Sequence, residues 1–287
     1  MADSKPSAVK AATSANSPKS GNAISWIAPL ACIVLGFFIW RVLLGNASNF
    51  AKPDPDPSHW FWPNHIGPKG ALVKMYEGGI IVPFLISCFL IVLTFVVERY
   101  LTVTKAKGTG DINEFIRRVQ FNLANKEIDK ALSECDKQKG SVGNVMKSGL
   151  RKYKEMITNT ELDTDQKVLN IQKEIEEATA LELPMLEKNL VFLSTLASVA
   201  TLIGLLGTVV GMIKSFSALG EEGGGGAAAA ELSKGIAEAL YNTALGIGTS
   251  AIAIICYNMF TTRIDSITYG IDESGFTLTQ SFAANYK

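Results

Sequence analysis

Hydrophobic residues gather in four long windows of the 287-residue chain, at residues 24–44, 80–97, 189–213 and 235–260. Each window is close to or above the roughly 18 apolar residues that suggest a membrane-spanning helix. Between the second and third windows, residues 98–188 hold 32 of the 54 charged residues, and their apolar positions recur at helical spacing. This pattern predicts an all-α, polytopic membrane protein with four transmembrane helices and a helical, charged insertion.

We expect five segments along the chain. Residues 1–22 are rich in Ser, Ala and Lys without periodicity, which is typical of a disordered N-terminal tail. The other four are an extra transmembrane helix with a periplasmic loop (23–79), a transmembrane helix with a cytoplasmic helical domain (80–188), a pore-lining helical hairpin (189–260) and a cytoplasmic tail (261–287). A signal peptide is the alternative for the first window, but a long region precedes it and Arg41 interrupts its apolar tail, so we favour an uncleaved helix.

The distribution of Lys and Arg beside the windows indicates the orientation. An even number of spans puts both termini on one side, which would carry nine basic residues near the membrane against six on the other. Because basic residues favour the cytoplasmic side, we expect both termini and residues 98–188 to be cytoplasmic. The formal net charge is zero, so the composition gives no reason to expect nucleic acid as a partner.

The residue types exclude several kinds of site. The four cysteines form no metal-type pair, and we interpret them as small packing residues. The two histidines, His59 and His65, have no third ligand spaced near them. No Walker loop, nucleophile triad or metal cluster occurs in the sequence. We therefore expect no enzyme activity, no metal and no cofactor.

One acid, Glu238, stands at the start of the fourth window. It is followed by 22 residues without a charge, 239–260. A carboxylate within such a segment costs about 2.5–3.5 kcal/mol at mid-depth, so it is rare and usually marks an ion path. Burial would favour the neutral acid and suit reversible protonation. The alternative is a hydrated carboxylate at the outer interface, near the helix start, where it would complement the helix dipole.

Hydroxyl side chains form a stripe on the third window. Four of them lie within about 80° of one another on a helical wheel: Ser194, Ser198, Thr201 and Thr208. Such hydroxyls either bond their own backbone or line a polar seam between helices, and we favour the seam because four are aligned. The neighbouring stripe consists of glycines that let helices approach closely: Gly204, Gly207 and Gly211.

The fourth window repeats this arrangement. Asn242 and Thr249 lie within about 40° of Glu238 on the wheel, and Gly246 flanks them. Thr243 lies about 140° from Glu238, so we expect it to meet a neighbouring helix instead. One chain offers a single such acid and two polar seams, and four helices make a poor closed pore. We therefore expect identical copies to assemble as a ring around an axis.

Two motifs carry a family resemblance. The segments IGLLGTVVGMIKSF (203–216) and GIAEALYNTALGIGTSAIAIICYN (235–258) resemble the MotA/TolQ/ExbB proton-channel family, and within it the ExbB type. By motif, Thr208 matches the pore threonine, Glu238 the glutamate of GIAEAL, and Thr243 the threonine five residues later. The resemblance implies an inner-membrane pentamer, embedded in lipid, whose ring encloses the transmembrane helices of an ExbD-like dimer.

The resemblance also implies a function. Together with a TonB-like protein, such a complex converts proton-motive force into mechanical work on outer-membrane transporters, and the proton-carrying aspartate would lie on the ExbD-like partner. The alternatives are a TolQ-like subunit of the Tol-Pal envelope system and a non-conducting membrane scaffold. A secondary transporter is disfavoured because the four spans show no inverted repeat. Two features depart from the family pattern: the additional first span, and Asn242 beside the usual threonine.

Overall fold

The computed structural model describes residues 20–56, 59, 63, 65–70, 73–221 and 226–286, so most of the expected N-terminal tail lies outside the described residues. The described chain is mostly helical. Four of its helical stretches are long and apolar enough to cross a membrane: Trp26–Leu44, Ile81–Ala124, Thr164–Ser217 and Leu232–Asn285. These stretches confirm the predicted helical, polytopic architecture, and each contains most or all of one hydrophobic window.

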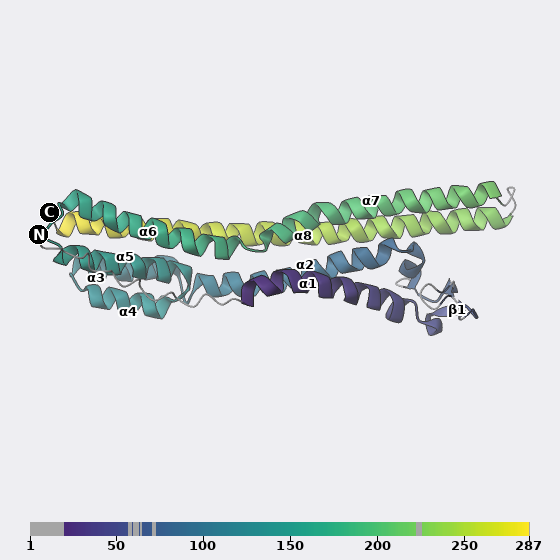
Figure 1. Ribbon diagram of the computed structural model, residues 1–287, viewed down its shortest axis with the longest axis horizontal. Coiled ribbons are helices and arrows are strands. Elements are labelled where there is room, and N and C mark those ends of the chain that lie inside the picture. Colours follow the sequence, from purple (N-terminus) through teal and green to yellow (C-terminus); the bar gives the residue numbers. More distant parts are fainter. Residues whose placement is uncertain are drawn as a thin grey trace, which may run out of the picture.

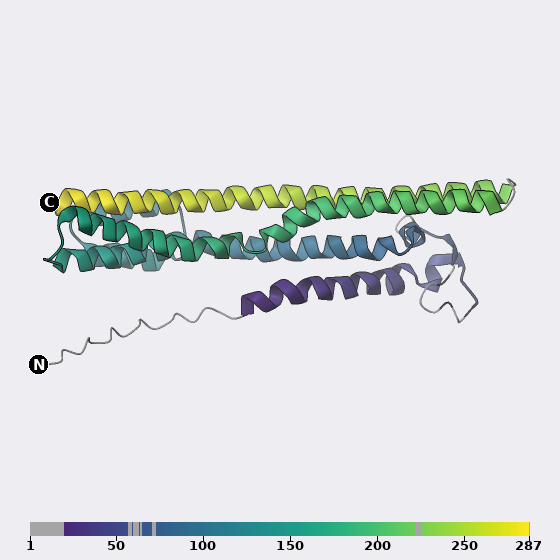
Figure 2. The ribbon, with the colours of Figure 1, turned by 45° about the horizontal axis from the view of Figure 1, so that its top comes forward.

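The N-terminal part is a helical hairpin with a small cap. Helix α1 (Ser20–Phe38) continues as a wider π-helical stretch, η1 (Ile39–Leu44), and lies beside α2 (Ile81–Lys107), as Figures 1 and 2 show. In the cap between them, the structure describes four short elements: η2 (Ala47–Asn49), β1 (Phe50–Lys52), β2 (Ile66–Pro68) and the 3-10 helix η4 (Val73–Gly78). The two strands pair antiparallel, which adds a small sheet to the predicted all-α fold. Strands of three residues are too short to give a period-2 signal.

Aromatic packing holds the cap against the start of α2. Trp40 stacks on Tyr76 with ring centroids 4.8 Å apart, and the buried side chains of Phe50 and Val82 complete this small core. The Tyr76 hydroxyl donates a hydrogen bond to Pro63 O at 3.3 Å. Because Tyr76 is anchored in this way, the end of η4 that follows it has a fixed position.

The charged insertion forms four helices, α3 (Ile112–Ala124), α4 (Ile128–Gln138), α5 (Gly140–Thr158) and α6 (Thr164–Glu187). Asp111 caps α3 by accepting a bond from Asn113 N at 2.7 Å, and Asp163 caps α6 through Gln166 N at 2.8 Å. Their apolar faces share one core, as their helical periodicity predicts.

The last two helices are the longest. Helix α7 (Leu190–Glu221) packs along the first part of α8 (Gly226–Asn285), and α8 runs the length of the molecule in Figure 2. The helix continues without a break across residue 260, where we expect the pore-lining hairpin to end and the cytoplasmic tail to begin. Apolar residues continue at helical spacing after the uncharged run ends, and Ile271, Leu278 and Phe282 are buried in the core with α5 and α6.

A short break separates α6 from α7. Asn189 has a positive φ of 66°, so the backbone turns between the two helices. Buried Arg99 of α2 donates from Nη1 to Leu186 O at 3.0 Å and from Nε to Glu98 Oε2 at 2.6 Å. Asn189 Nδ2 donates to the same Glu98 oxygen at 3.3 Å. Hydrogen bonds with α2 thus hold the break between α6 and α7 in place.

Candidate functional site

Glu238 lies near the start of α8, between basic side chains. The residue is 7% exposed. Lys214 Nζ of α7 lies 4.0 Å from its Oε2, and Lys234 Nζ, one turn earlier on α8, lies 3.9 Å from its Oε1. Both ammonium groups favour the charged carboxylate, whereas burial favours the neutral acid. The structure therefore combines features of both sequence alternatives, since the acid is buried and also lies beside the charges that end the apolar run.

A second acid shares one of these lysines. Lys234 Nζ lies 3.8 Å from Glu77 Oε1 of η4, so it stands between two carboxylates from different elements. The cluster of Glu77, Lys214, Lys234 and Glu238 was not predicted from the sequence. Only the i,i+4 spacing of Lys234 and Glu238 was a readable signal. Glu77 and Lys214 reach the site through packing between distant parts of the chain.

Two further polar residues follow Glu238 into the helix. Asn242 and Thr249 are each 2% exposed. Asn242 Nδ2 donates to Gly78 O of η4 at 3.1 Å. Within the described part of the chain, Asn242 Oδ1 and Thr249 Oγ1 are buried without a hydrogen-bond partner. Such atoms are uncommon in folded proteins and require an explanation.

Glycines bring α7 and α8 into backbone contact beside this acid. A Cβ added at Gly207 would lie 2.5 Å from Asn242 Cβ, and one at Gly211 would lie 2.9 Å from Ala239 Cβ. A Cβ at Gly246 would lie 2.9 Å from Gly204 Cα. Because nothing larger than glycine fits without movement, the small residues set the distance between the helices.

Hydroxyl groups of α7 and α8 bond either the neighbouring helix or their own. Thr243 Oγ1 of α8 donates across to Gly204 O of α7 at 3.1 Å. On α7, Ser194 and Thr208 bond their own helix, to Val191 O at 3.1 Å and Leu205 O at 2.6 Å. Ser198 is exposed and Thr201 is half-buried.

The outward hydroxyls are thus separate from the acid in a single chain. Thr208 lines an open hollow on α7 together with Met212 and Phe216, and this hollow includes neither Glu238 nor Asn242. The structure brings Asn242, Thr243 and the four glycines to the contact that holds Glu238. It leaves the stripe of Ser198, Thr201 and Thr208 on another face of α7.

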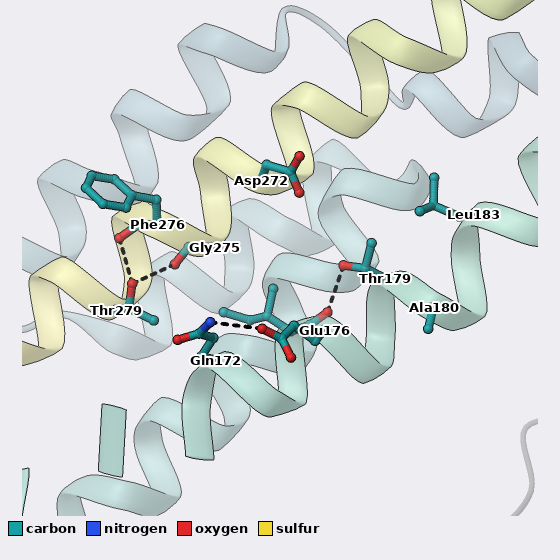
Figure 3. A pocket seen from close by; sticks show the side chains of 10 residues that line it. Gln172, Glu176, Thr179, Ala180, Leu183, Asp272, Gly275, Phe276 and Thr279 are labelled. Carbon is teal, nitrogen blue, oxygen red and sulfur yellow. Dashed lines mark hydrogen bonds between the residues drawn. The ribbon is translucent and has the colours of Figure 1, made fainter. Parts of the chain in front are cut away.

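The hollow between α6 and α8 lies far from this site. It has a volume of about 520 Å³, and Figure 3 shows Gln172 and Glu176 of α6 and Asp272 and Phe276 of α8 among the residues that line it. Asp272 follows Glu238 by 34 residues, which is about 50 Å along a helix. Gln172 Nε2 already donates to Glu176 Oε1 at 2.9 Å. Among the residues that the structure describes, no cluster of His, Cys, Asp and Glu could hold a metal ion.

Comparison with known proteins identifies the family. A model of the MotA/TolQ/ExbB proton channel family matches residues 137–273, which include α7 and the part of α8 around Glu238. The Tol-Pal system protein TolQ of Pseudomonas aeruginosa is 30% identical over 183 residues, which cover 58% of this chain and 78% of that protein.

Two further relatives agree with this match. TolQ of Haemophilus influenzae is 42% identical over 96 residues, or 32% of this chain and 41% of that protein. A putative biopolymer transport protein ExbB homolog of Methanothermobacter thermautotrophicus is 25% identical over 203 residues, or 68% and 65%. The chain therefore belongs to the MotA/TolQ/ExbB proton channel family.

Proposed function

We propose that this chain is a subunit of a proton-driven motor in the bacterial inner membrane, of the ExbB or TolQ type. In this proposal, five copies of the chain form a ring around the transmembrane helices of an ExbD-like dimer. Family membership supports this function, and one observation carries it: Glu238 of α8 is buried, and the ammonium groups of Lys214 and Lys234 lie 4.0 and 3.9 Å from its carboxylate oxygens. The proposed role involves no enzymatic step and no cofactor.

In this proposal Glu238 gains and loses a proton reversibly. When charged, it is attracted by Lys214 and Lys234, and when neutral it loses most of that attraction. One proton crossing the membrane potential supplies about 2.3 kcal/mol per 100 mV. That energy is enough to bias a ring between two packing arrangements, provided that the two arrangements bind the proton differently.

The stripe of Ser198, Thr201 and Thr208 has a separate role in the proposal. Ser198 is exposed, Thr201 is half-buried, and Thr208 borders an open hollow on α7. In a ring, this stripe would line the central pore and meet the partner helices. Thr243 would hold α8 in register with α7 through its bond to Gly204 O.

We favour the ExbB role, in which a TonB-like protein uses the motor to energise transport across the outer membrane. The TolQ role in the Tol-Pal envelope system is the second candidate, and the match over 78% of the Pseudomonas TolQ supports it. Expressing this chain in bacterial cells that lack either ExbB or TolQ separates the two. Restored siderophore uptake would indicate the ExbB role, and restored cell-envelope constriction would indicate the TolQ role.

The first test is proton flux through the assembled complex. The full chain is co-expressed with its ExbD-like partner, purified and placed in vesicles, and flux is followed with a pH-sensitive dye. We expect Glu238→Ala and Thr208→Val to assemble normally, as judged by the mass of the complex, and to lower flux by at least about tenfold, because each removes a proton-handling group.

Matched changes elsewhere serve as controls. Glu161→Ala removes an exposed acid outside the spans, and Thr262→Val removes a hydroxyl that bonds its own helix at Asn258 O. Both controls should conduct like the unmodified chain. Undiminished flux in both test variants would contradict a motor role, and absence of flux in every sample, the unmodified complex included, would favour a structural scaffold.

A further inference from the structure

Asn242 is clamped between three elements. Its Nδ2 donates to Gly78 O of η4, and the residue is almost fully buried. A Cβ added at Gly207 of α7 would lie 3.0 Å from Nδ2, and one added at Gly78 would lie 2.9 Å from Oδ1. The side chain therefore lies close against the backbone of both glycines. Because a carbonyl can only accept, the bond to Gly78 O also settles which end of the amide is Nδ2.

The other end of the amide is an acceptor without a donor in the described part of the chain. Buried amide oxygens are nearly always hydrogen-bonded, because removing them from water without a partner is unfavourable. A mobile donor nearby would be stabilised by this oxygen. Its position on α8 indicates which group that donor is.

Glu238 lies one helical turn before Asn242 on the same face of α8. Side chains at i and i+4 are neighbours, with Cβ atoms about 5–6 Å apart. Helical side chains also lean toward the N-terminus, so the amide of Asn242 covers the turn that carries Glu238. A charged carboxylate has no hydrogen to donate to Oδ1, whereas the protonated acid has one O–H donor.

We infer that Asn242 Oδ1 accepts a hydrogen bond from Glu238 when that acid is protonated. The carboxyl group then changes partners, from the two lysines when charged to Asn242 when neutral. The proton stays on the Glu238 oxygen throughout, and Asn242 only accepts the hydrogen bond. The inference deepens the proposed function and rests on it, since it names the residue that receives the proton-loaded acid.

The charges around Glu238 favour this exchange of partners. Lys214 from α7 and Lys234 from α8 face the acid, and Glu77 from η4 faces Lys234. Among the side chains that the structure describes here, two ammonium groups stand beside two carboxylates while Glu238 is charged. Protonation of Glu238 removes one of these negative charges, and the neutral acid no longer attracts the lysines strongly.

Infrared difference spectroscopy tests the inference on the full chain in vesicles. The protonated carboxyl band of Glu238 is identified by its loss in Glu238→Gln and followed as pH changes. Removing the acceptor in Asn242→Ala should destabilise the neutral acid, so the midpoint moves to lower pH by about 0.5–1 unit. The carboxyl band should also move to higher frequency, because its hydrogen bond is lost.

Two more variants complete the design. Asn258→Ala removes an exposed asparagine of the same helix and should change neither the midpoint nor the band. Asn242→Ser is a smaller change that keeps a hydroxyl acceptor, and it should give an intermediate shift. If Asn242→Ala fails to assemble, the midpoint and the carboxyl band of Asn242→Ser still test the inference. A residue that only supports the fold would lower flux without moving the midpoint.

The outcomes separate this inference from the proposed function. If Glu238 titrates and flux depends on it, but the assembled Asn242 variants keep the original midpoint and band, the inference is wrong and the motor role stands. If Glu238→Gln removes no band and leaves flux unchanged, the proposed role of Glu238 is itself wrong.

Discussion

At the scale of single residues, Cys135 shows what burial does to an ionisable side chain. The thiol lies on α4 and is 2% exposed. Burial raises the pKa of Cys135 to about 12, with a further upward contribution from Asp136 that Lys147 partly opposes. Thiolates are the reactive form of cysteine, so this side chain should be chemically inert at neutral pH.

Thiol labelling tests this directly, in a chain whose other cysteines are replaced by alanine. At pH 8 only about one Cys135 thiol in 10⁴ is ionised, and its maleimide labelling should be at least about a hundredfold slower than that of an exposed thiol. Ser133→Cys, combined with Cys135→Ala, supplies that exposed thiol on the same helix. Labelling of Cys135 should still rise with pH above about 10, where the exposed control thiol is almost fully ionised and its rate has levelled off. Equal rates at pH 8 would show that Cys135 is accessible.

Glu238 shows how far single residues could be predicted from the sequence. An acid before 22 uncharged residues is visible in the sequence, and so is its lysine four residues earlier. Lys214 and Glu77 could not be foreseen, because they approach Glu238 and Lys234 only after α7 and η4 pack against α8. The acceptor on Asn242 was also hidden, since whether an amide is satisfied depends on its tertiary neighbours.

At the scale of elements, the contact between α7 and α8 depends on residues without side chains. A Cβ at Gly246 would lie 2.6 Å from Ala200 O, closer than real Cβ atoms approach. Gly248, two positions later on α8, has nothing within 4 Å of an added Cβ. The same substitution should therefore have opposite effects at these two glycines.

Thermal unfolding of the two alanine variants checks this. Gly246→Ala should destabilise the protein by about 1–3 kcal/mol, because the helices must separate to admit the methyl group. Gly248→Ala should be neutral or stabilising by up to about 1 kcal/mol, because alanine favours the helix at an open position. Equal melting temperatures for the two variants would mean that the helices do not meet at Gly246.

Glycine spacing predicted this contact better than hydroxyl spacing predicted a seam. A small-residue stripe has one simple use on an apolar helix, which is close packing. A hydroxyl has two uses, because it can bond its own helix or reach a neighbouring one. Ser194 and Thr208 bond their own helix within the single chain. The cap strands were missed for another reason: three residues on each side are held by packing around Trp40 and Tyr76, not by strand propensity.

At the scale of the whole molecule, Arg99 joins the membrane-spanning part to the charged helical insertion. Its guanidinium pairs with Glu98 on α2 and bonds Leu186 O at the end of α6. Asn189, in the break before α7, donates to the same carboxylate. One buried network thus connects α2, α6 and α7 at the point where the chain passes from one part to the other.

Removing this guanidinium should weaken the whole fold. Arg99→Gln leaves Glu98 with an uncompensated charge and Leu186 O without its donor, and we expect a loss of about 3–5 kcal/mol. Arg151→Gln, at an exposed position of α5, should change stability by less than about 0.5 kcal/mol. Thermal unfolding of the purified protein measures both. Similar melting temperatures would show that the network adds little to the connection.

The continuity of α8 has a mechanical consequence. It is a single helix of 60 residues that contains no proline, which is one common cause of a sharp kink. Such a rod is about 90 Å long, and a tilt of about 3° at one end would swing the other by about 5 Å. If α8 moves as one body, a small tilt beside Glu238 would therefore displace its C-terminal turns sideways by a much larger distance.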